Sequence, residues 1–226
     1  MKRSQINEII RQSIAFFDEM MFRLPKWGYW SPQEWKDESA DLSEITETML
    51  GWDLTDFGAG DFSSKGLVLF TIRNGRPTGD DKPYAEKIMI VEEQQQTPMH
   101  FHWRKVEDII NRGGGNLILE IYGSTKQEHL SDKPVIVQID GIPEVVQPGG
   151  KVVLSPGQSI CLRTGVYHKF YGEPGKGRVL VGEVSSVNDD ISDNRFFEPQ
   201  GRFPFIEQDE EPDYFLVTDY QNYLNG

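Results

Sequence analysis

The feature that most restricts the fold is a long series of short apolar stretches separated by turn-forming residues. These stretches are rich in Val, Ile and Leu and are bounded by Gly, Pro, Asn or Asp, a pattern typical of β-strands. We predict strands at residues 66–73, 87–91, 116–122, 135–139, 151–154, 158–162, 168–171 and 178–184. Many short strands without helical patterns between them favour an antiparallel sandwich or small barrel over a parallel sheet with crossover helices.

The N-terminal end has a helical pattern instead. Residues 4–21 place apolar side chains at steps of three and four, at Ile6, Ile9, Ile10, Ile14, Phe17 and Met21. This spacing predicts a helix that packs on the outside of the sheet. Residues 31–34, Ser-Pro-Gln-Glu, have the pattern of a capping box and indicate a second, short helix.

A chain of 226 residues is long enough for one sizeable core, and we predict a single domain over residues 1–226. Within it, residues 1–40 form a helical N-terminal extension and residues 66–185 form the barrel core. Residues 186–226 alternate acidic runs with phenylalanines, which indicates a segment that packs against the core. We expect this C-terminal segment to cover the open mouth of the barrel.

The charge of the chain excludes some partners. Asp and Glu outnumber Lys and Arg by 36 to 23, which gives a formal net charge of −13, and no basic patch stands out. A phosphate backbone would be repelled, so a nucleic acid partner is not expected. No apolar run has the length that a bilayer requires, and the N-terminus is polar and amphipathic. We expect a cytoplasmic protein without a membrane partner.

Histidine is scarce, and its distribution predicts a metal site. Three of the four histidines, His100, His102 and His168, fall in two short pieces of the chain. On an extended strand, His100 and His102 leave the same face, and a tight turn can return Glu107 to that face. Three imidazole nitrogens and one carboxylate suit a divalent transition metal ion with coordination positions left open.

These residues resemble the two cupin motifs. The first motif, His-x-His, four residues, Glu, six residues, Gly, is matched by His100, His102, Glu107 and Gly114, and the second by Gly157, Gly165 and His168. The fold that this resemblance implies is mainly β, a cupin-type antiparallel β-barrel or jelly roll. Residues 1–22, 27–35, 107–115, 159–162 and 202–204 resemble, more narrowly, the D-lyxose isomerase family. That resemblance implies a manganese-dependent aldose–ketose isomerase.

The chemistry expected at such a site is a proton transfer. The three histidines and one glutamate leave two positions of an octahedral ion for the carbonyl and hydroxyl oxygens of an open-chain sugar. The metal then stabilises the enediol while a base moves a proton between C2 and C1. The resemblance implies Lys105 near the substrate oxygens, either as a proton shuttle with a lowered pKa or as a charged group. We predict Glu207 as the base, and Lys87, Trp27 and Arg195 as substrate contacts.

The resemblance implies interconversion of D-lyxose and D-xylulose, with D-mannose and D-fructose as lesser substrates. The same ligands suit Fe²⁺, Co²⁺ or Zn²⁺ as well as Mn²⁺, so a ferrous dioxygenase is a second hypothesis. A non-catalytic sugar-binding cupin is a third. Because cupin barrels often pair through strands and terminal helices, we also expect a homodimer.

Overall fold

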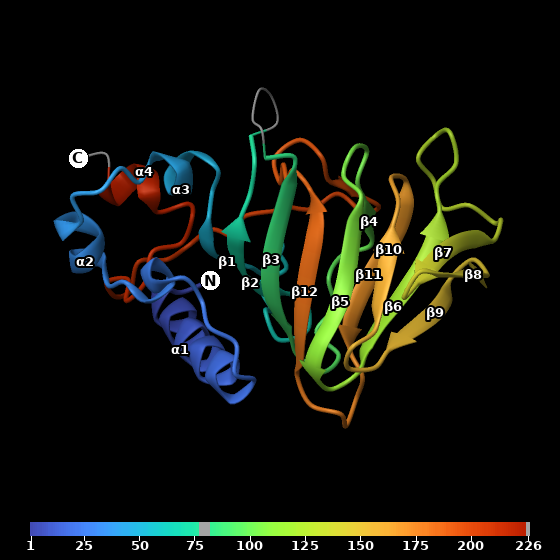
Figure 1. Cartoon of the computed structure of the whole chain (residues 1–226), viewed down its shortest axis with the longest axis horizontal. Helices are drawn as coiled ribbons and strands as arrows, with labels where there is room; N and C mark the ends of the chain where they lie inside the picture. The colour runs from blue at the N-terminus through green and yellow to red at the C-terminus, as the bar shows by residue number, and fades with distance from the viewer. Residues whose placement is uncertain (77–81, 225–226) are drawn as a thin grey trace.

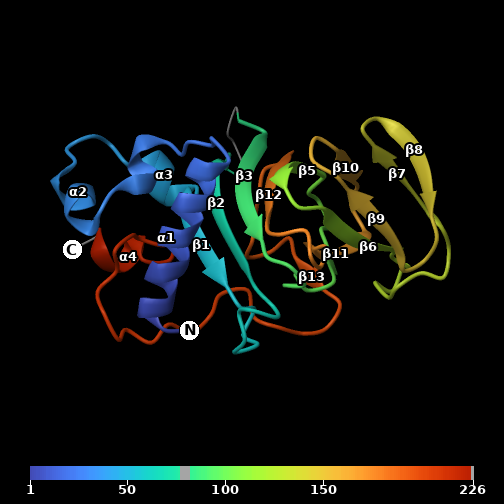
Figure 2. The same cartoon turned by 90° about the horizontal axis from the view of Figure 1, so that it is seen from below.

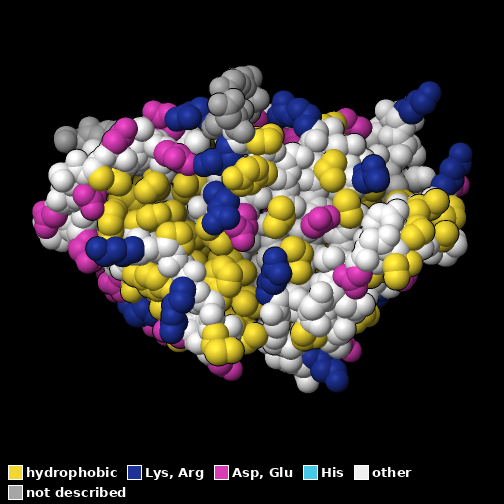
Figure 3. Space-filling view, viewed as in Figure 1, with side chains coloured by type: hydrophobic (Ala, Val, Ile, Leu, Met, Phe, Trp, Pro, Cys, Tyr) yellow, Lys and Arg dark blue, Asp and Glu magenta, His cyan; other side chains and the backbone are white. Residues whose placement is uncertain are grey.

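The computed structural model describes residues 1–76 and 82–224. Thirteen strands in these residues form two antiparallel sheets, which confirms the mainly β fold predicted from the sequence. Helices gather at one end of the sheets, and β7, β8 and β9 lie at the other end (Figure 1). The face of the molecule in Figure 3 carries Lys and Arg side chains singly, interspersed with Asp and Glu.

The larger sheet has eight strands. In spatial order they are β1 (Gly51–Thr55), β2 (Leu67–Arg73), β3 (Tyr84–Val91), β12 (Val179–Ser186), β5 (Glu107–Gly114), β10 (Ser159–Leu162), β7 (Val135–Ile139) and β8 (Ile142–Val146). The smaller sheet has five, in the order β13 (Arg195–Phe196), β4 (His100–Phe101), β11 (Val166–Gly172), β6 (Leu117–Gly123) and β9 (Gly150–Leu154). The fold therefore brings β4, β11 and β13 side by side, although they lie far apart in the sequence.

Side-chain alternation along the strands divides the apolar residues between two cores. On β3, Met89 and Val91 join the core between the two sheets, whereas Ile88 and Ile90 face the opposite side. The outer side is covered by α1 (Arg3–Glu19), whose Ile6 and Ile10 are fully buried. The larger sheet is thus buried on both faces at this end, because the predicted N-terminal helix packs on its outside.

Shorter helices extend the covering layer. They are η1 (Lys26–Tyr29), α2 (Pro32–Asp37), α3 (Ser43–Glu47) and α4 (Tyr220–Tyr223). The capping box predicted for α2 is present, since the Ser31 hydroxyl accepts the Glu34 N–H and the Glu34 carboxylate accepts the Ser31 N–H. Within the described residues, no helix has both the length and the apolarity that crossing a membrane requires.

Four strands of the described residues were not predicted, β1, β5, β8 and β13. For β1, the glycines and short polar pieces of residues 41–61 predict a loop with one helical turn, but Gly51–Thr55 pairs along its whole length with β2. All five residues of β1 are buried, and the alternation of Trp52 and Leu54 with Asp53 and Thr55 is too short to distinguish a strand from the polar pieces around it. Hydrogen bonding to β2 and packing of Trp52 and Leu54 against α1 stabilise this strand.

The C-terminal segment connects the smaller sheet with the helical end of the molecule. After β13 it runs beneath the sheets to the helical end, where it meets the N-terminus (Figure 2). There the guanidinium of Arg3, which is fully buried, donates two hydrogen bonds to the Asp219 carboxylate, at 2.9 and 2.8 Å. This ion pair joins the two ends of the chain.

Substituting Arg3 by Met should therefore strongly destabilise the fold. The change leaves the Asp219 carboxylate buried without its cation, which costs about 3–5 kcal/mol of unfolding free energy. Urea denaturation measures the loss, and Arg11→Met serves as the control because Arg11 forms its ion pair with Glu8 at the surface. Equal losses for the two variants would contradict this role of the buried pair.

Candidate active site

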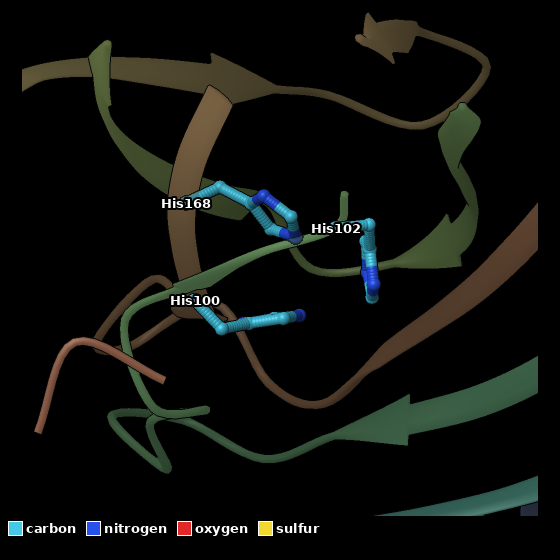
Figure 4. Close-up of side chains that lie close together, drawn as sticks. All are labelled: His100, His102 and His168. Atoms are coloured by element: carbon cyan, nitrogen blue, oxygen red, sulfur yellow. The ribbon is translucent and has the colours of Figure 1, made fainter. Parts of the chain in front are cut away.

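Three histidines predicted to bind metal come together between the two sheets. His100 lies on β4 and is the cross-strand partner of His168 on β11, while His102 follows β4. Their ligand atoms all lie within 4.8 Å of one another, and the three rings turn toward one shared space (Figure 4). The side chain between them, Phe101, points the other way and packs edge-on against Tyr167. The alternation predicted for this short strand is confirmed.

Backbone hydrogen bonds fix which nitrogen of each histidine can bind a metal. His100 Nδ1 lies 2.9 Å from the Pro98 carbonyl, His102 Nδ1 2.8 Å from that of Asp193, and His168 Nδ1 3.0 Å from that of Val166. A carbonyl oxygen only accepts hydrogen bonds, so Nδ1 carries the proton in each ring. The Nε2 atoms are left with free lone pairs, as metal-binding histidines require.

Glu107, the first residue of β5, closes this group of ligands. Its Oε1 lies 3.0 Å from His168 Nε2 and 3.4 Å from His102 Nε2. Among the described residues, Glu107 Oε1 and His102 Nε2 are both buried and have no hydrogen-bond partner. Lone pairs that face each other in a buried site repel unless a cation lies between them. A spacing of about 3 Å also fits adjacent donors around an ion bound at about 2.1 Å.

The ionisation of these ligands also suits a cation. Burial, together with the nearby His168 and His102, holds the pKa of His100 well below its usual value, so the imidazole is neutral. Burial alone would raise the pKa of Glu107, but the Lys105 ammonium and His102 keep it well below the usual range. The site therefore offers the neutral imidazole of His100 and the carboxylate of Glu107 beside the Nε2 atoms of His102 and His168, and this donor set fits a divalent metal ion.

Two buried lysines and a second glutamate lie beside the histidines. The Lys105 ammonium is 2.8 Å from Glu107 Oε2 and donates a 2.9 Å hydrogen bond to Glu183 Oε1. Lys87 lies 3.7 Å from the same Glu183 oxygen and donates to Asn188 Oδ1 at 2.6 Å. A turn after His102 brings Lys105 to the pocket, as the sequence allowed. Glu183 comes from β12, next to Lys87 across the sheet.

The charges of these side chains stabilise each other. Burial disfavours the ammonium of Lys105, yet Glu107 and Glu183 outweigh that effect and raise its pKa above the usual value. Burial likewise disfavours the carboxylate of Glu183, but Lys105 and Lys87 hold its pKa below the usual value. Without metal, Lys105 is therefore a cation and Glu183 an anion.

The C-terminal segment supplies another wall of the pocket. Arg202 lines it, and its Nη2 donates to Asp53 Oδ2 at 2.5 Å and to Asp190 Oδ2 at 3.1 Å. The other terminal nitrogen, Arg202 Nη1, is buried and has no hydrogen-bond partner among the described residues. Apolar side chains such as Phe57 and Phe196 complete the lining. The pocket thus combines an apolar wall with a free, positively charged hydrogen-bond donor.

Three predicted site residues lie elsewhere. Glu207 is exposed, and its backbone pairs with Met1 and Arg3, so its side chain does not reach the pocket. Trp27 packs against Phe70 and Trp35 in the helical layer, with ring centroids 4.9 and 6.1 Å apart.

Arg195 neighbours the pocket-lining Phe196 on β13, so alternation turns it to the other side of the strand. There its guanidinium donates to Glu128 at 2.9 Å. Lys87 and Lys105 are the predicted catalytic and substrate-contacting residues that do lie in the pocket.

The sequence reading missed Glu183 and Asp190. A signal for Glu183 existed, because it continues the core-facing positions Val179 and Val181 of β12 at a spacing of two. An acidic residue on the inward face of a strand is rarely structural. Asp190 lies within an acidic run that resembles an ordinary solvated surface, so its place in the pocket could not be read from its neighbours.

Comparisons with known proteins identify the family. A sequence model described as D-lyxose isomerase matches residues 1–220. A D-lyxose/D-mannose isomerase of Serratia proteamaculans is 48% identical over 99% of this chain and 100% of its own length. One from Escherichia coli O157:H7 is also 48% identical, over 99% of this chain and its whole length.

A solved structure is similar in fold. The L-ribose isomerase of Cellulomonas parahominis, determined with L-ribose, matches with a TM-score of 0.62 over 92% of this chain and 98% of its own. At 16% sequence identity this likeness concerns the fold alone. The sequence matches and the resemblance of the two motifs agree, and the chain belongs to the D-lyxose isomerase family.

Proposed function

We propose that this protein is a metal-dependent aldose–ketose isomerase that interconverts D-lyxose with D-xylulose and D-mannose with D-fructose. The observation that carries the proposal is the buried group of His100, His102, His168 and Glu107 beside Lys105 and Glu183. The names of the two relatives at 48% identity support the choice of sugars. Manganese is the proposed ion, from the resemblance that the sequence carries.

The proposed metal ligands are His100 Nε2, His102 Nε2, His168 Nε2 and a Glu107 carboxylate oxygen. When bound, a divalent ion supplies the Lewis acidity that makes the hydrogen on the carbon beside a sugar carbonyl more acidic. The protein orients the ligands through the three backbone carbonyls that accept from Nδ1. It excludes water by burying His102, Glu107 and His168 to at least nine-tenths.

Proton transfer is assigned to Glu183. Its carboxylate is ionised and lies in the pocket, so it can take the proton from C2 of the aldose and deliver it to C1. The charged Lys105 ammonium donates a hydrogen bond where negative charge develops on the sugar oxygens. Because the reaction also moves a proton from O2 to O1, Lys105 is the group proposed to exchange it. Glu183 thus replaces Glu207 as the proposed base.

The sugar hydroxyls beyond C2 are assigned to the Arg202 wall. A series of ion pairs through Asp190, Lys87, Glu183 and Lys105 separates Arg202 from the metal ligand Glu107. The free Nη1 of Arg202 is therefore proposed to donate to a hydroxyl distant from the reacting carbons. A buried charged donor gains a partner when the sugar binds, which favours binding.

The other two hypotheses receive less support. A ferrous dioxygenase and a non-catalytic sugar-binding cupin would both be consistent with the three histidines and Glu107. Neither accounts for the isomerase names of full-length relatives at 48% identity or for an ionised Glu183 beside a charged Lys105. The homodimer, which the molar mass in solution tests, and the cytoplasmic location stay proposals drawn from the sequence.

Glu183→Gln should abolish most of the turnover. The substitution keeps the shape of the side chain but removes the base, so kcat for D-lyxose should fall about 10²–10⁴-fold while Mn²⁺ still binds. Formation of D-xylulose measures kcat, and calorimetry measures metal binding. Glu207→Gln is the matched comparison, since that exposed carboxylate was the base predicted from the sequence.

The two variants separate the assignments. Full turnover in Glu183→Gln, with a large loss in Glu207→Gln, would restore Glu207 as the base. A wild-type protein that forms no ketose from D-lyxose or D-mannose would contradict the proposed reaction itself.

Arg202→Lys should weaken sugar binding more than it slows chemistry. Lysine keeps the positive charge beside Asp53 and Asp190 but lacks the Nη1 donor, so KM for D-lyxose should rise roughly tenfold or more. Steady-state kinetics measure KM and kcat, and thermal unfolding monitors the fold. An unchanged KM in a variant of normal stability would remove Arg202 from the proposed substrate contacts.

A further inference from the structure

One buried carboxylic acid residue, Asp193, contacts residues 102–105, the metal loop, at several points. Asp193 lies in the segment between β12 and β13, and only 2% of its surface is exposed. Its Oδ1 accepts the backbone N–H of Arg104 at 2.9 Å, and its Oδ2 accepts that of Lys105 at 2.9 Å. Its backbone carbonyl accepts from His102 Nδ1 at 2.8 Å. A single residue thus contacts three of the four positions from His102 to Lys105.

These contacts position the two functional side chains of the metal loop, His102 and Lys105. The Asp193 carbonyl sets the proton on Nδ1 of His102 and so leaves Nε2 free to bind metal. The Asp193 carboxylate fixes the backbone turn from which the Lys105 side chain reaches Glu107 and Glu183. Without it, two N–H groups of this turn would lose their acceptor, and the turn could adopt other conformations.

The same segment also forms part of the pocket wall. Asp190 and Asn194, on either side of Asp193, both line the pocket. On the outer side of the segment, the exposed Arg104 guanidinium donates to Asp189 and Ser192, and these contacts lie at the surface. Asp193 is therefore the buried connection between the metal loop and the wall that faces the sugar.

We propose that Asp193 is a positioning residue, which holds the His102 ring and the Lys105 turn in register with the C-terminal wall of the pocket. It acts through these residues and is not assigned a contact with the sugar. The inference rests on the proposed function for its effect on turnover, but not for its effect on metal binding. Loss of such supporting hydrogen bonds typically costs about 10–100-fold in metal affinity or activity.

Asp193→Asn tests this role with a side chain of the same shape. The amide oxygen can accept one of the two backbone N–H groups, but the amide nitrogen is a donor and opposes the other. Asp189→Asn is the matched control, since Asp189 lies in the same segment and accepts from Ile191, Ser192 and Arg104 but contacts neither His102 nor the Lys105 backbone. The measurements are the Mn²⁺ affinity by calorimetry, kcat and KM for D-lyxose, and the thermal unfolding of each variant.

For Asp193→Asn we expect Mn²⁺ affinity to fall about tenfold and kcat to fall about 10–100-fold, with a smaller change in KM. Asp189→Asn should stay within about threefold of the wild type. Equal metal affinity and kcat in the two variants would overturn the proposal. If the wild type forms no ketose, the proposed function fails, and the Mn²⁺ affinities alone still decide the role of Asp193.

Hydrogen exchange on the wild type covers the case in which Asp193→Asn does not fold. We expect slow exchange of the Arg104 and Lys105 amides, which donate to Asp193, and slower exchange of these amides and of residues 189–194 after Mn²⁺ is added. Exchange of the two amides at the rate of an unstructured peptide, or no response of residues 189–194 to Mn²⁺, would overturn the proposal.

Discussion

The site depends on one electrostatic constraint: lone pairs of histidine nitrogens and of a glutamate oxygen face each other, buried between the two sheets. His102 Nε2 and His168 Nε2 face Glu107 Oε1 at 3.4 and 3.0 Å, and backbone carbonyls hold the imidazole protons on the opposite nitrogens. Such an arrangement is unfavourable without a cation among the acceptors. The carboxylates Glu107, Glu183 and Asp190 and the basic side chains Lys87, Lys105 and Arg202 line the same pocket. A divalent ion bound there would add positive charge, which favours an oxyanion developing on a sugar.

The fold meets this constraint by bringing distant segments together. Pairing of β4 with β11 sets His100 opposite His168, β12 carries Glu183 beside Lys87 of β3, and the C-terminal segment adds Arg202. Each of these groups is held by a strand or by hydrogen bonds to a strand, so the positions depend on the sheet register. The helical layer buries the outer face of the larger sheet. The C-terminal segment lines the pocket on the other face.

The sequence predicted the parts of this protein that local patterns determine. Short apolar stretches bounded by turn residues revealed most strands, and the His-x-His pair with its glutamate revealed the candidate metal ligands, because both are patterns within one short piece of the chain. β1 was missed because its alternation of apolar and polar residues covers only Trp52 to Thr55, within a segment rich in glycine and polar residues. Glu207 was misplaced because the path of the C-terminal segment follows from its backbone pairing with Arg3, 204 residues away, and no local pattern encodes that contact. Trp27 packs against Phe70 in the helical layer, and Arg195 donates to Glu128. Neither contact can be predicted from the residues next to them in the sequence.

The central claim is that a metal ion held by the three histidines and Glu107 drives sugar isomerisation. It is tested most directly by the turnover of D-lyxose to D-xylulose in chelator-stripped protein, before and after addition of Mn²⁺, for the wild type and for His168→Ala. The account predicts that stripping abolishes turnover, that Mn²⁺ restores it in the wild type, and that it restores little in the variant. Full turnover in the stripped wild type, or in His168→Ala, would contradict it.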